Sequence, residues 1–500
     1  MASGDTPTDT TSSDLSPQGA DASHKRSFFG QPRALAHIFG VEMWERFSFY
    51  GMQGILIYYL YFSVADGGLG MPQAAAAGIV GAYGGGVYLS TVLGAWLADR
   101  VFGSERVLFS SAIIIVCGHV ALALLPGFVG VGIGLILVAL GSGGLKANAT
   151  SVVGTLYSQD DTRRDAGFSL FYLGINLGSF VGPIVTGALQ SSVGFHIGFG
   201  AAAVGMVLGL IQYSIGRRGL PASAREVPNP LSGAGRLTWT FIGVVAVAVV
   251  VGLCLTGVIR ADNLPGIVIA VTVLAAIAYF IVLLTSRKLD ATERHRVFAF
   301  IPLFLASSAF WSLYQQQFTV IPIYAEQRLD LNLFGWAIPP TWVQSINPIF
   351  IILLSGAFAA LWTKWGARQP STPVKFGLGT AGVGVAFLIF LMWSGGEGAT
   401  TPFFAIVLIL FVFTIAELLI SPVGLSVSTK LAPRSMRAQM VALFFLSIAL
   451  GSAVSGQLAS LYESLPEGTY FSIIGGIAIV LGIIVAAISP WVLRLMRGVR

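Results

Sequence analysis

Charged side chains are scarce in this sequence of 500 residues, in which Asp, Glu, Lys and Arg together make up 10%. They supply about a quarter of an ordinary soluble chain, whose surface needs them to stay in water. Hydrophobic residues reach 55%, and the mean hydropathy is +0.81. This composition excludes a soluble globule and predicts a polytopic membrane protein whose main solvent is lipid.

Several kinds of reactive site are missing as well. The only two cysteines, Cys117 and Cys254, lie within apolar stretches, which argues against a disulfide framework or a metal cage. The sequence contains no closely spaced Cys/His set, GxSxG elbow or P-loop. Residues 141–146 have some likeness to a phosphate loop, but their spacing differs, and within an apolar segment they favour close helix packing. We therefore expect no enzyme, cofactor or metal, and no site for ATP.

Long apolar segments make up most of the chain. A Ser/Thr/Asp-rich stretch over residues 1–27 lacks the apolar residues to form a core. Each later segment can cross the ~30 Å hydrocarbon layer as a helix, which satisfies its own backbone hydrogen bonds there. We count fourteen such segments, at 34–63, 77–99, 106–126, 128–152, 165–190, 194–216, 237–258, 264–286, 297–323, 336–363, 374–394, 402–429, 436–461 and 468–493.

Basic residues distinguish the two sets of loops. One set contains pairs such as Arg163–Arg164, Arg217–Arg218 and Arg287–Lys288, whereas the opposite set contains only Arg260 and Arg328. Because basic loops stay in the cytoplasm, both termini are expected to be cytoplasmic. The protein itself is expected in a cell (inner or plasma) membrane. The net charge of +6 is thus explained by topology, and no nucleic-acid partner is expected.

The segments at 237–258 and 264–286 contain almost no polar side chains beyond Thr and Tyr. We expect this pair to lie at the periphery, facing lipid, with six spans before it and six after. Two such halves are the usual arrangement of secondary transporters. The predicted organisation is a disordered cytoplasmic tail (1–33), an N-terminal six-helix bundle (34–218), cytoplasmic linkers with two extra transmembrane helices (219–296) and a C-terminal six-helix bundle (297–500).

Five charged residues lie deep within the apolar segments: Glu42, Glu45, Arg46, Lys146 and Glu417. A charge at membrane depth is costly, so each is a functional candidate. Positions 42, 45, 46, 49, 50 and 53 recur at helical spacing, and this stripe must face protein or water. One interpretation is a structural ion pair between Glu42 and Arg46. The other is proton coupling, because two acids beside one base leave a carboxylate that is not fully compensated.

Glu417 shares a helix face with Ser421, beside a helix-bending Pro422. Its own segment has no basic residue nearby, so it needs a partner from another helix or a ligand. The intramembrane cations available are Lys146 and Arg46. The alternative is a glutamic acid that stays protonated and only packs.

Two other segments contain polar faces, one with Tyr172 and Asn176 and one with Gln344 and Asn347. Amides and hydroxyls in membrane spans either hold helices together or bind a ligand. For Tyr172 and Gln344 the sequence leaves both interpretations open.

The polar motifs together resemble those of the proton-dependent oligopeptide transporter family (POT, also called PTR) of the major facilitator superfamily. Residues 42–51, EMWERFSFYG, resemble its ExxERFxYY motif, and residues 165–178 resemble FYxxINxG. Residues 417–424 resemble its E-x-x-x-S-P-x-G stretch, and residues 94–106 resemble the superfamily's loop between the second and third spans. The resemblance extends from about 34 to 496 and implies the major facilitator fold, with two six-helix bundles plus an inserted helical pair (14 transmembrane helices).

The resemblance also implies a function, which is symport of protons with di- and tripeptides by alternating access. By position, the residues that match the peptide site are Arg46, Tyr50, Tyr88, Lys146, Asn176, Asn347, Glu417 and Ser421, and those that match the proton-coupling glutamates are Glu42 and Glu45. Proton coupling is then expected to involve Glu42, Glu45, Arg46, Lys146 and Glu417. A monomer in the bilayer is expected to suffice.

Four positions depart from the family pattern. Gln53 stands where many members have Arg or Lys, and the seventh core span, around Tyr314, has no carboxylate to pair with Lys146. Phe444 replaces a Trp and Phe49 replaces the first Tyr of the motif. We still assign Gln53, Tyr314 and Phe444 to the substrate site, with an altered pocket shape.

Three functions remain in view. The first is a proton-coupled peptide importer in which Glu417 and Arg46 hold the two peptide termini. The second is a proton-coupled transporter of another small substrate, such as a drug, nitrate or another anion, which the departures at Gln53 and in the seventh span keep open. The third is a membrane sensor or scaffold that does not transport.

Overall fold

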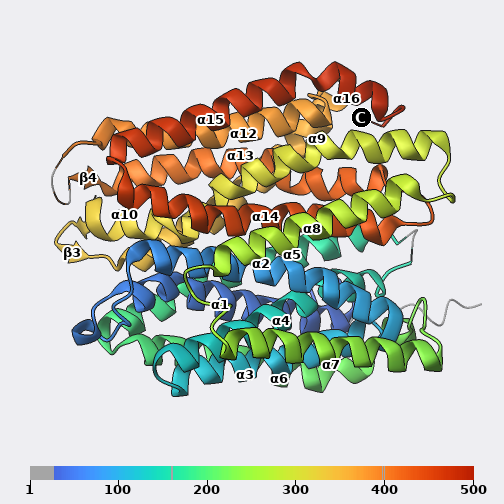
Figure 1. Cartoon of the computed structure of the whole chain (residues 1–500), viewed down its shortest axis with the longest axis horizontal. Coiled ribbons are helices and arrows are strands. Elements are labelled where there is room, and N and C mark those ends of the chain that lie inside the picture. The colour runs from blue at the N-terminus through green and yellow to red at the C-terminus, as the bar shows by residue number, and fades with distance from the viewer. Residues whose placement is uncertain (1–27, 159–160, 397, 399, 500) are drawn as a thin grey trace, which may run out of the picture.

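The computed structural model describes residues 28–158, 161–396, 398 and 400–499. Residues 1–27 of the predicted tail lie outside this part of the chain. Long helices run side by side, and the N-terminal half of the chain lies beside the C-terminal half (Figure 1). The cavity described below lies between these two halves.

The first half consists of six long helices, each of which satisfies its backbone internally as a lipid environment requires. They are α1 (Arg33–Tyr61), α2 (Gln73–Leu97), α3 (Ser104–Leu124), α4 (Gly127–Gly154), α5 (Arg164–Ser192) and α6 (Phe195–Gly216). α1 packs against α5 and α6, and α4 packs against α2 and α3. Shorter turns connect them: η2 (Val64–Asp66), the π-helical turn η3 (Ala98–Phe102), and η4 (Arg217–Gly219) with η5 (Ala222–Arg225) in the linker that follows α6.

The second half begins at a helix with a complete N-terminal cap, in which the Asp290 side chain accepts from Glu293 N–H and Glu293 accepts from Asp290 N–H. Its helices are α9 (Ala291–Tyr314), η6 (Gln315–Phe318), α10 (Val320–Arg328), η7 (Pro340–Ser345), α11 (Ile346–Trp365), η8 (Gly366–Arg368), α12 (Thr372–Ile389), η9 (Phe390–Trp393), α13 (Phe403–Lys430), α14 (Arg437–Ser464), α15 (Glu467–Ala487) and α16 (Ser489–Leu495). α12 packs against α13 and α15, and α9 packs against α14.

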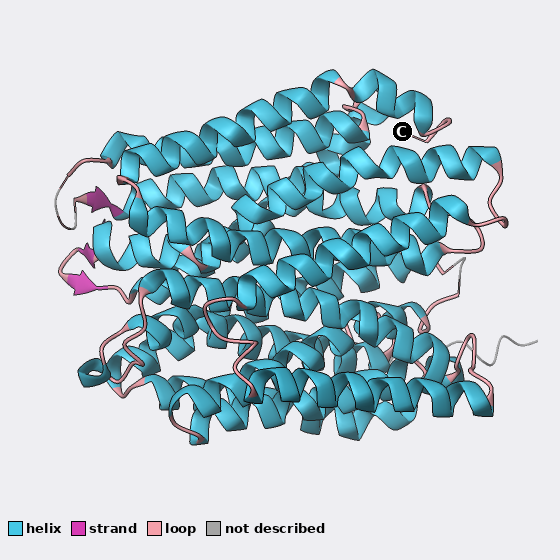
Figure 2. Ribbon diagram, viewed as in Figure 1, coloured by secondary structure: helices cyan, strands magenta, loops and turns pink. Residues whose placement is uncertain are grey.

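Four two-residue strands lie at one end of the molecule (Figure 2). β1 (Leu329–Asp330) pairs in parallel with β4 (Thr401–Pro402), and β2 (Asn332–Leu333) pairs antiparallel with β3 (Trp336–Ala337). These strands belong to the loops that follow α10 and precede α13, so they join helix ends rather than form a core.

Two helices connect the halves, α7 (Gly233–Leu255) and α8 (Leu264–Thr285). α7 has no buried residue, as expected of a peripheral helix, and its Trp239 ring lies 5.1 Å from that of Trp96. α8 also has most of its residues at least partly exposed, and its four buried residues are Pro265, Thr272, Ala276 and Leu283. It packs against α2 and α14, where the two halves meet.

Within the described residues, thirteen helical segments are long and apolar enough to cross a membrane. The sequence predicted fourteen such segments, and the one not among these thirteen is α1. It has 29 residues, but Glu42, Glu45 and Arg46 lower its hydropathy. Most of its residues are buried among the other helices, so these charges face protein rather than lipid.

The span predicted at 297–323 lies within one candidate membrane span, Ala291–Arg328, but its helix breaks. α9 ends at Tyr314, and Thr319 has φ −120° and ψ −72°, outside the helical region, before α10 begins. Three consecutive glutamines occupy the break, and one of them, Gln316, accepts a 2.6 Å hydrogen bond from the Tyr470 hydroxyl. Carboxamides in a membrane need such partners, so the bend turns them toward protein.

Two other predicted spans are also interrupted, both at proline. The span predicted from 336 starts as β3 and η7, since Pro339 and Pro340 disfavour a regular α-helix there. The last predicted span, 468–493, ends as α15 at Ala487, and the short α16 follows with Pro490 in its first turn. These differences concern helix ends and leave the order of the spans unchanged.

Glycines allow two close helix contacts. A Cβ added at Gly143 would lie 2.5 Å from the Ser90 carbonyl carbon, so the glycine-rich run in α4 is a helix-packing surface, as expected. A Cβ added at Gly81 of α2 would lie 2.6 Å from the Cα of Gly456 in α14. The two halves of the protein therefore touch backbone to backbone at this point.

Candidate functional site

A cavity of about 450 Å³ lies between the two halves. α1, α2 and α5 line it on one side, and α9, η6, η7, α11 and α13 line it on the other. The predicted site residues among its lining are Tyr50, Gln53, Tyr88, Asn176, Tyr314, Asn347, Glu417 and Ser421. The structure thus brings together residues that are far apart in the sequence, at a size suited to a small organic ligand.

The three charges of α1 form one buried cluster behind the cavity wall. Arg46 donates to Glu42 Oε1 from Nε at 2.9 Å and from Nη2 at 2.5 Å, and its Nη1 lies 3.1 Å from Glu45 Oε2. Glu45 also accepts a 2.5 Å hydrogen bond from Ser142 of α4. All three charged side chains are at most 5% exposed. One guanidinium is thus shared by two carboxylates, which leaves one negative charge in excess.

Lys146 lies on α4, one helical turn beyond Ser142. Its Nζ is 5.0 Å from the ring centre of Phe49 and 4.7 Å from that of Tyr88. In the part of the chain that the structure describes, no carboxylate forms an ion pair with it. Two aromatic faces therefore hold this ammonium group, in agreement with the missing acid of the seventh span.

Glu417 of α13 is held by neutral groups. Its Oε2 accepts a 2.6 Å hydrogen bond from the Tyr314 hydroxyl of α9 and a 3.1 Å bond from Asn347 Nδ2 of α11. Asn347 also donates to the Thr414 hydroxyl at 3.0 Å. The expectation of a partner from another helix is met, but neither of the two intramembrane cations is that partner.

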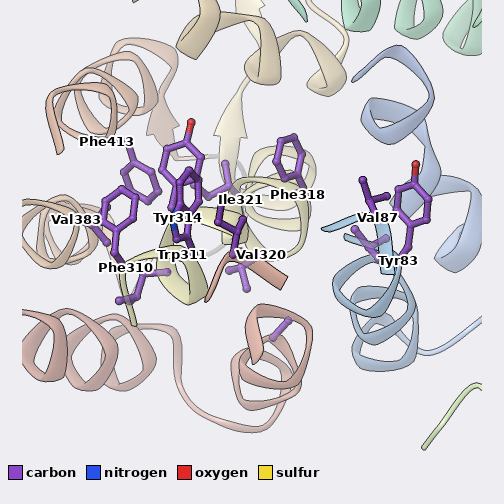
Figure 3. Close-up of a cluster of buried hydrophobic side chains, with 14 of the residues drawn as sticks. Tyr83, Val87, Phe310, Trp311, Tyr314, Phe318, Val320, Ile321, Val383 and Phe413 are labelled. Carbon is purple, nitrogen blue, oxygen red and sulfur yellow. The ribbon is translucent and has the colours of Figure 1, made fainter. Parts of the chain in front are cut away.

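Aromatic side chains fix the position of Tyr314. Figure 3 shows its ring beside those of Phe310, Trp311 and Phe413. The Phe310 ring stacks on it at 5.6 Å, and the Trp311 ring meets it edge-on at 5.2 Å. The hydroxyl is therefore directed at Glu417 by packing as well as by hydrogen bonding.

The remaining predicted residues lie outside the cavity lining. Arg46 and Lys146 lie behind it, next to the lining residues Tyr50 and Phe49. Phe444 does not line the cavity in this structure: a Cβ added at Gly424 would meet the Phe444 ring, so the ring fills the gap that this glycine leaves in α13, and its assignment to the substrate site stays a prediction.

Sequence reasoning left several lining residues unassigned. They include Trp311, Gln315, Gln317, Phe318 and Trp362, while Tyr172 and Gln344, whose roles were left open, also line the cavity. For Gln315 and Gln317 the sequence did contain a signal, which is a run of glutamines inside an apolar segment, because unpaired amides in lipid are costly.

The arrangement can bind a small zwitterion. Its cavity contains one acid, Glu417, and two cations, Arg46 and Lys146, lie just behind the wall. Carboxylates neutralise Arg46, whereas aromatic rings hold Lys146. Such a site can hold opposite charges on one ligand without any covalent chemistry.

Comparison with known proteins gives consistent matches. The PTR2 profile of the POT family matches residues 105–477. The uncharacterized transporter YclF of Bacillus subtilis (strain 168) is 44% identical over 479 residues, covering 95% of this chain and 97% of that protein. A di-/tripeptide transporter of Lactococcus lactis subsp. cremoris is 42% identical over 493 residues, covering 95% and 99%. A crystal structure of a mutant peptide transporter POT in complex with alafosfalin matches with a TM-score of 0.89 at 44% identity, covering 95% and 97%.

The family profile spans most of the chain, and relatives above 40% identity align with it nearly end to end. The fold agrees, since all long segments are helices in two halves around a central cavity. This chain therefore belongs to the POT family, whose members are multi-pass membrane transporters with the major facilitator fold.

Proposed function

We propose that this protein is a proton-coupled symporter that imports di- and tripeptides by alternating access. The proposal is carried by the presence of two separate charged groups. One acid, Glu417, lines the cavity, and a guanidinium, Arg46, lies behind the cavity wall, where carboxylates already bind it. A relative named as a di-/tripeptide transporter, aligned over nearly its whole length, supports the same substrate class.

The two ends of a peptide are the groups that such a site recognises. Glu417 and Asn347 hold the ammonium group, and Arg46 and Lys146 hold the carboxylate. Tyr50, Tyr88, Asn176, Tyr314 and Ser421 complete the wall around the peptide, and Phe444 supports α13 from behind. Because the termini carry most of the recognition, many side chains are accepted.

Proton coupling arises at the α1 cluster. Arg46 is bound to Glu42 and lies beside Glu45, so a peptide carboxylate can engage the guanidinium only when these acids release it. Protonation of either acid removes one of the two competing negative charges. Protons and peptide thereby favour the same state of the transporter.

The halves 34–218 and 297–500 rock against each other about the cavity, and 219–296 connects them. The described halves touch near the end of α1, where the Tyr58 hydroxyl donates to the Pro322 carbonyl at 3.0 Å, and Trp342 Nε1 donates to the Ile184 carbonyl at 3.1 Å. With both termini in the cytoplasm of a cell-membrane protein, this closed end faces outward. A single chain provides the whole pathway, so we propose a functional monomer.

The test is uptake of labelled dialanine by proteoliposomes under an imposed inward proton gradient. Accumulation above equilibrium that collapses when a protonophore is added supports the proposal. Accumulation that is unaffected by the gradient contradicts proton coupling, and the absence of any uptake or binding of peptides contradicts the substrate class.

A second candidate is proton-coupled transport of another small substrate, such as a drug, nitrate or another anion. The ammonium group of Lys146, held only by aromatic rings in the described structure, favours it because a small anion can pair with such a cation. Nitrate that competes with a labelled ligand while dipeptides fail to compete would establish this candidate.

A further inference from the structure

Two carboxamides in the cavity wall lack hydrogen-bond partners among the described residues. Gln53 of α1 is 3% exposed, and its Oε1 has no partner. Gln344 of η7 is 9% exposed, and neither its Oε1 nor its Nε2 has one. Buried polar atoms in folded proteins are almost always paired, so two such residues lining one cavity indicate a ligand that completes them.

The two carboxamides belong to one corner of the cavity. A Cβ added at Gly54, the neighbour of Gln53, would lie 3.6 Å from Gln344 Oε1. Side chains on either side of Gln344 fix η7 to α5, because Trp342 Nε1 donates to a backbone carbonyl there at 3.1 Å and Ser345 Oγ to another at 2.8 Å. The segment that carries the unpaired amide is thus fixed before any ligand arrives, which favours a specific contact.

This corner is uncharged. Gln53 lies seven residues beyond Arg46 on α1, about 10 Å along the helix axis. Glu417 is the one residue with a formal charge among the described residues that line the cavity. A charged side chain placed in the corner loses its hydration without gaining an opposite charge, and an apolar side chain leaves the amides unpaired.

We infer that this corner is a subsite for the carboxamide side chain of a substrate, so that peptides containing Gln or Asn are preferred. A primary carboxamide presents a donor and an acceptor side by side and can pair with both atoms of Gln344, whichever way that amide is turned. A trans peptide bond directs its N–H and C=O to opposite sides and cannot do so. The inference rests on the proposed peptide transport and adds a side-chain preference to it.

The experiment compares three dipeptide side chains of similar length as competitors of labelled dialanine uptake. Ala-Gln, Ala-Glu and Ala-Met are measured, together with the reversed sequences, in proteoliposomes containing the full chain. Two additional hydrogen bonds of about 1 kcal/mol each predict that a glutamine peptide competes roughly tenfold or more better than its Glu and Met counterparts. Gln344→Met is expected to bring the Gln-to-Met ratio close to one.

Gln457→Met is the matched control, since Gln457 is an exposed residue of α14 that does not line the cavity, and it should keep the wild-type ratio. If Gln344→Met does not transport, ligand-induced thermal shifts with the same peptides give the ratio from binding alone. Equal competition by all three side chains, or a preference that survives Gln344→Met, overturns the inference. Failure of dialanine itself to be bound or taken up contradicts the proposed function instead.

Discussion

The contact between a peptide ammonium group and Glu417 can be tested by replacing that carboxylate with Gln, which keeps its shape. The two donors that hold Glu417, Tyr314 at 2.6 Å and Asn347 at 3.1 Å, both bond to Oε2, and no hydrogen bond from the described residues reaches Oε1. One carboxylate oxygen is therefore available to a ligand, in a part-buried site where a hydrogen bond to a charged group contributes about 1.5–3 kcal/mol.

That energy corresponds to a factor of about 10 to 150 in affinity. We expect Glu417→Gln to weaken dialanine binding by this factor and to leave N-acetyl-dialanine, which has no ammonium group, nearly unchanged. Purified protein in detergent is titrated with each ligand, so a variant that no longer transports still gives the answer. The two proteins and two ligands form a cycle whose coupling energy isolates the contact.

The control is Glu226→Gln, an exposed carboxylate in the linker after η5 without a side-chain contact in the structure. It should bind both ligands as the unaltered protein does. An equal loss of affinity for dialanine and its acetylated form in Glu417→Gln would refute the assigned contact, because the carboxylate would then act on shape or stability rather than on the ammonium group.

Three other predictions follow from buried contacts. Glu45→Gln should abolish stimulation of uptake by a proton gradient while peptide exchange continues, measured by counterflow, and normal driven uptake would contradict the coupling scheme. Gly81→Val should reduce transport at least tenfold, because the added atoms meet the backbone at Gly456. Gly86→Val should be tolerated, because no atom lies within 4 Å of a Cβ added there. Equal activities of the two variants would contradict a role for the close contact between the two halves. Glu105→Gln should lower the Tm, because this fully buried carboxylate binds two part-exposed arginines of the linker. The loss of these contacts costs about 1–3 kcal/mol of stability, and an unchanged Tm would contradict a stabilising role of Glu105.

The sequence predicted what local composition determines. Apolar runs of about twenty residues located the long helices, and helical spacing placed Glu42, Glu45 and Arg46 on one face. The three do form one cluster, because spacing within a single helix fixes which side chains meet. The lack of an acidic partner for Lys146 was expected instead from the resemblance to the family, whose seventh-span acid is missing here, and no described carboxylate forms an ion pair with it.

Contacts between distant helices could not be obtained in that way. The bond from Tyr314 to Glu417 joins residues 103 positions apart, and it depends on how α9 and α13 pack. Glu105 directly precedes the predicted span at 106–126, where the sequence gives no sign of burial, yet the linker of η4 and η5 folds over the start of α3 and buries it. The packing of Phe444 could not be predicted for the same reason, since the space beside Gly424 that its ring fills is visible only in the folded chain.

The shared guanidinium explains how one structure can couple two ligands. In the described state Arg46 is bound to Glu42 and lies beside Glu45, so a peptide carboxylate must displace them or wait until a proton neutralises one of them. In the proposed mechanism a proton raises the affinity for peptide, and by reciprocity a bound peptide raises the affinity for the proton. Lys146 is held by aromatic rings rather than by these acids, so we expect it to stay available to the peptide carboxylate before and after protonation. We therefore propose that the coupling resides in Arg46 and its two acids, and we expect the loss of the seventh-span acid to leave it intact.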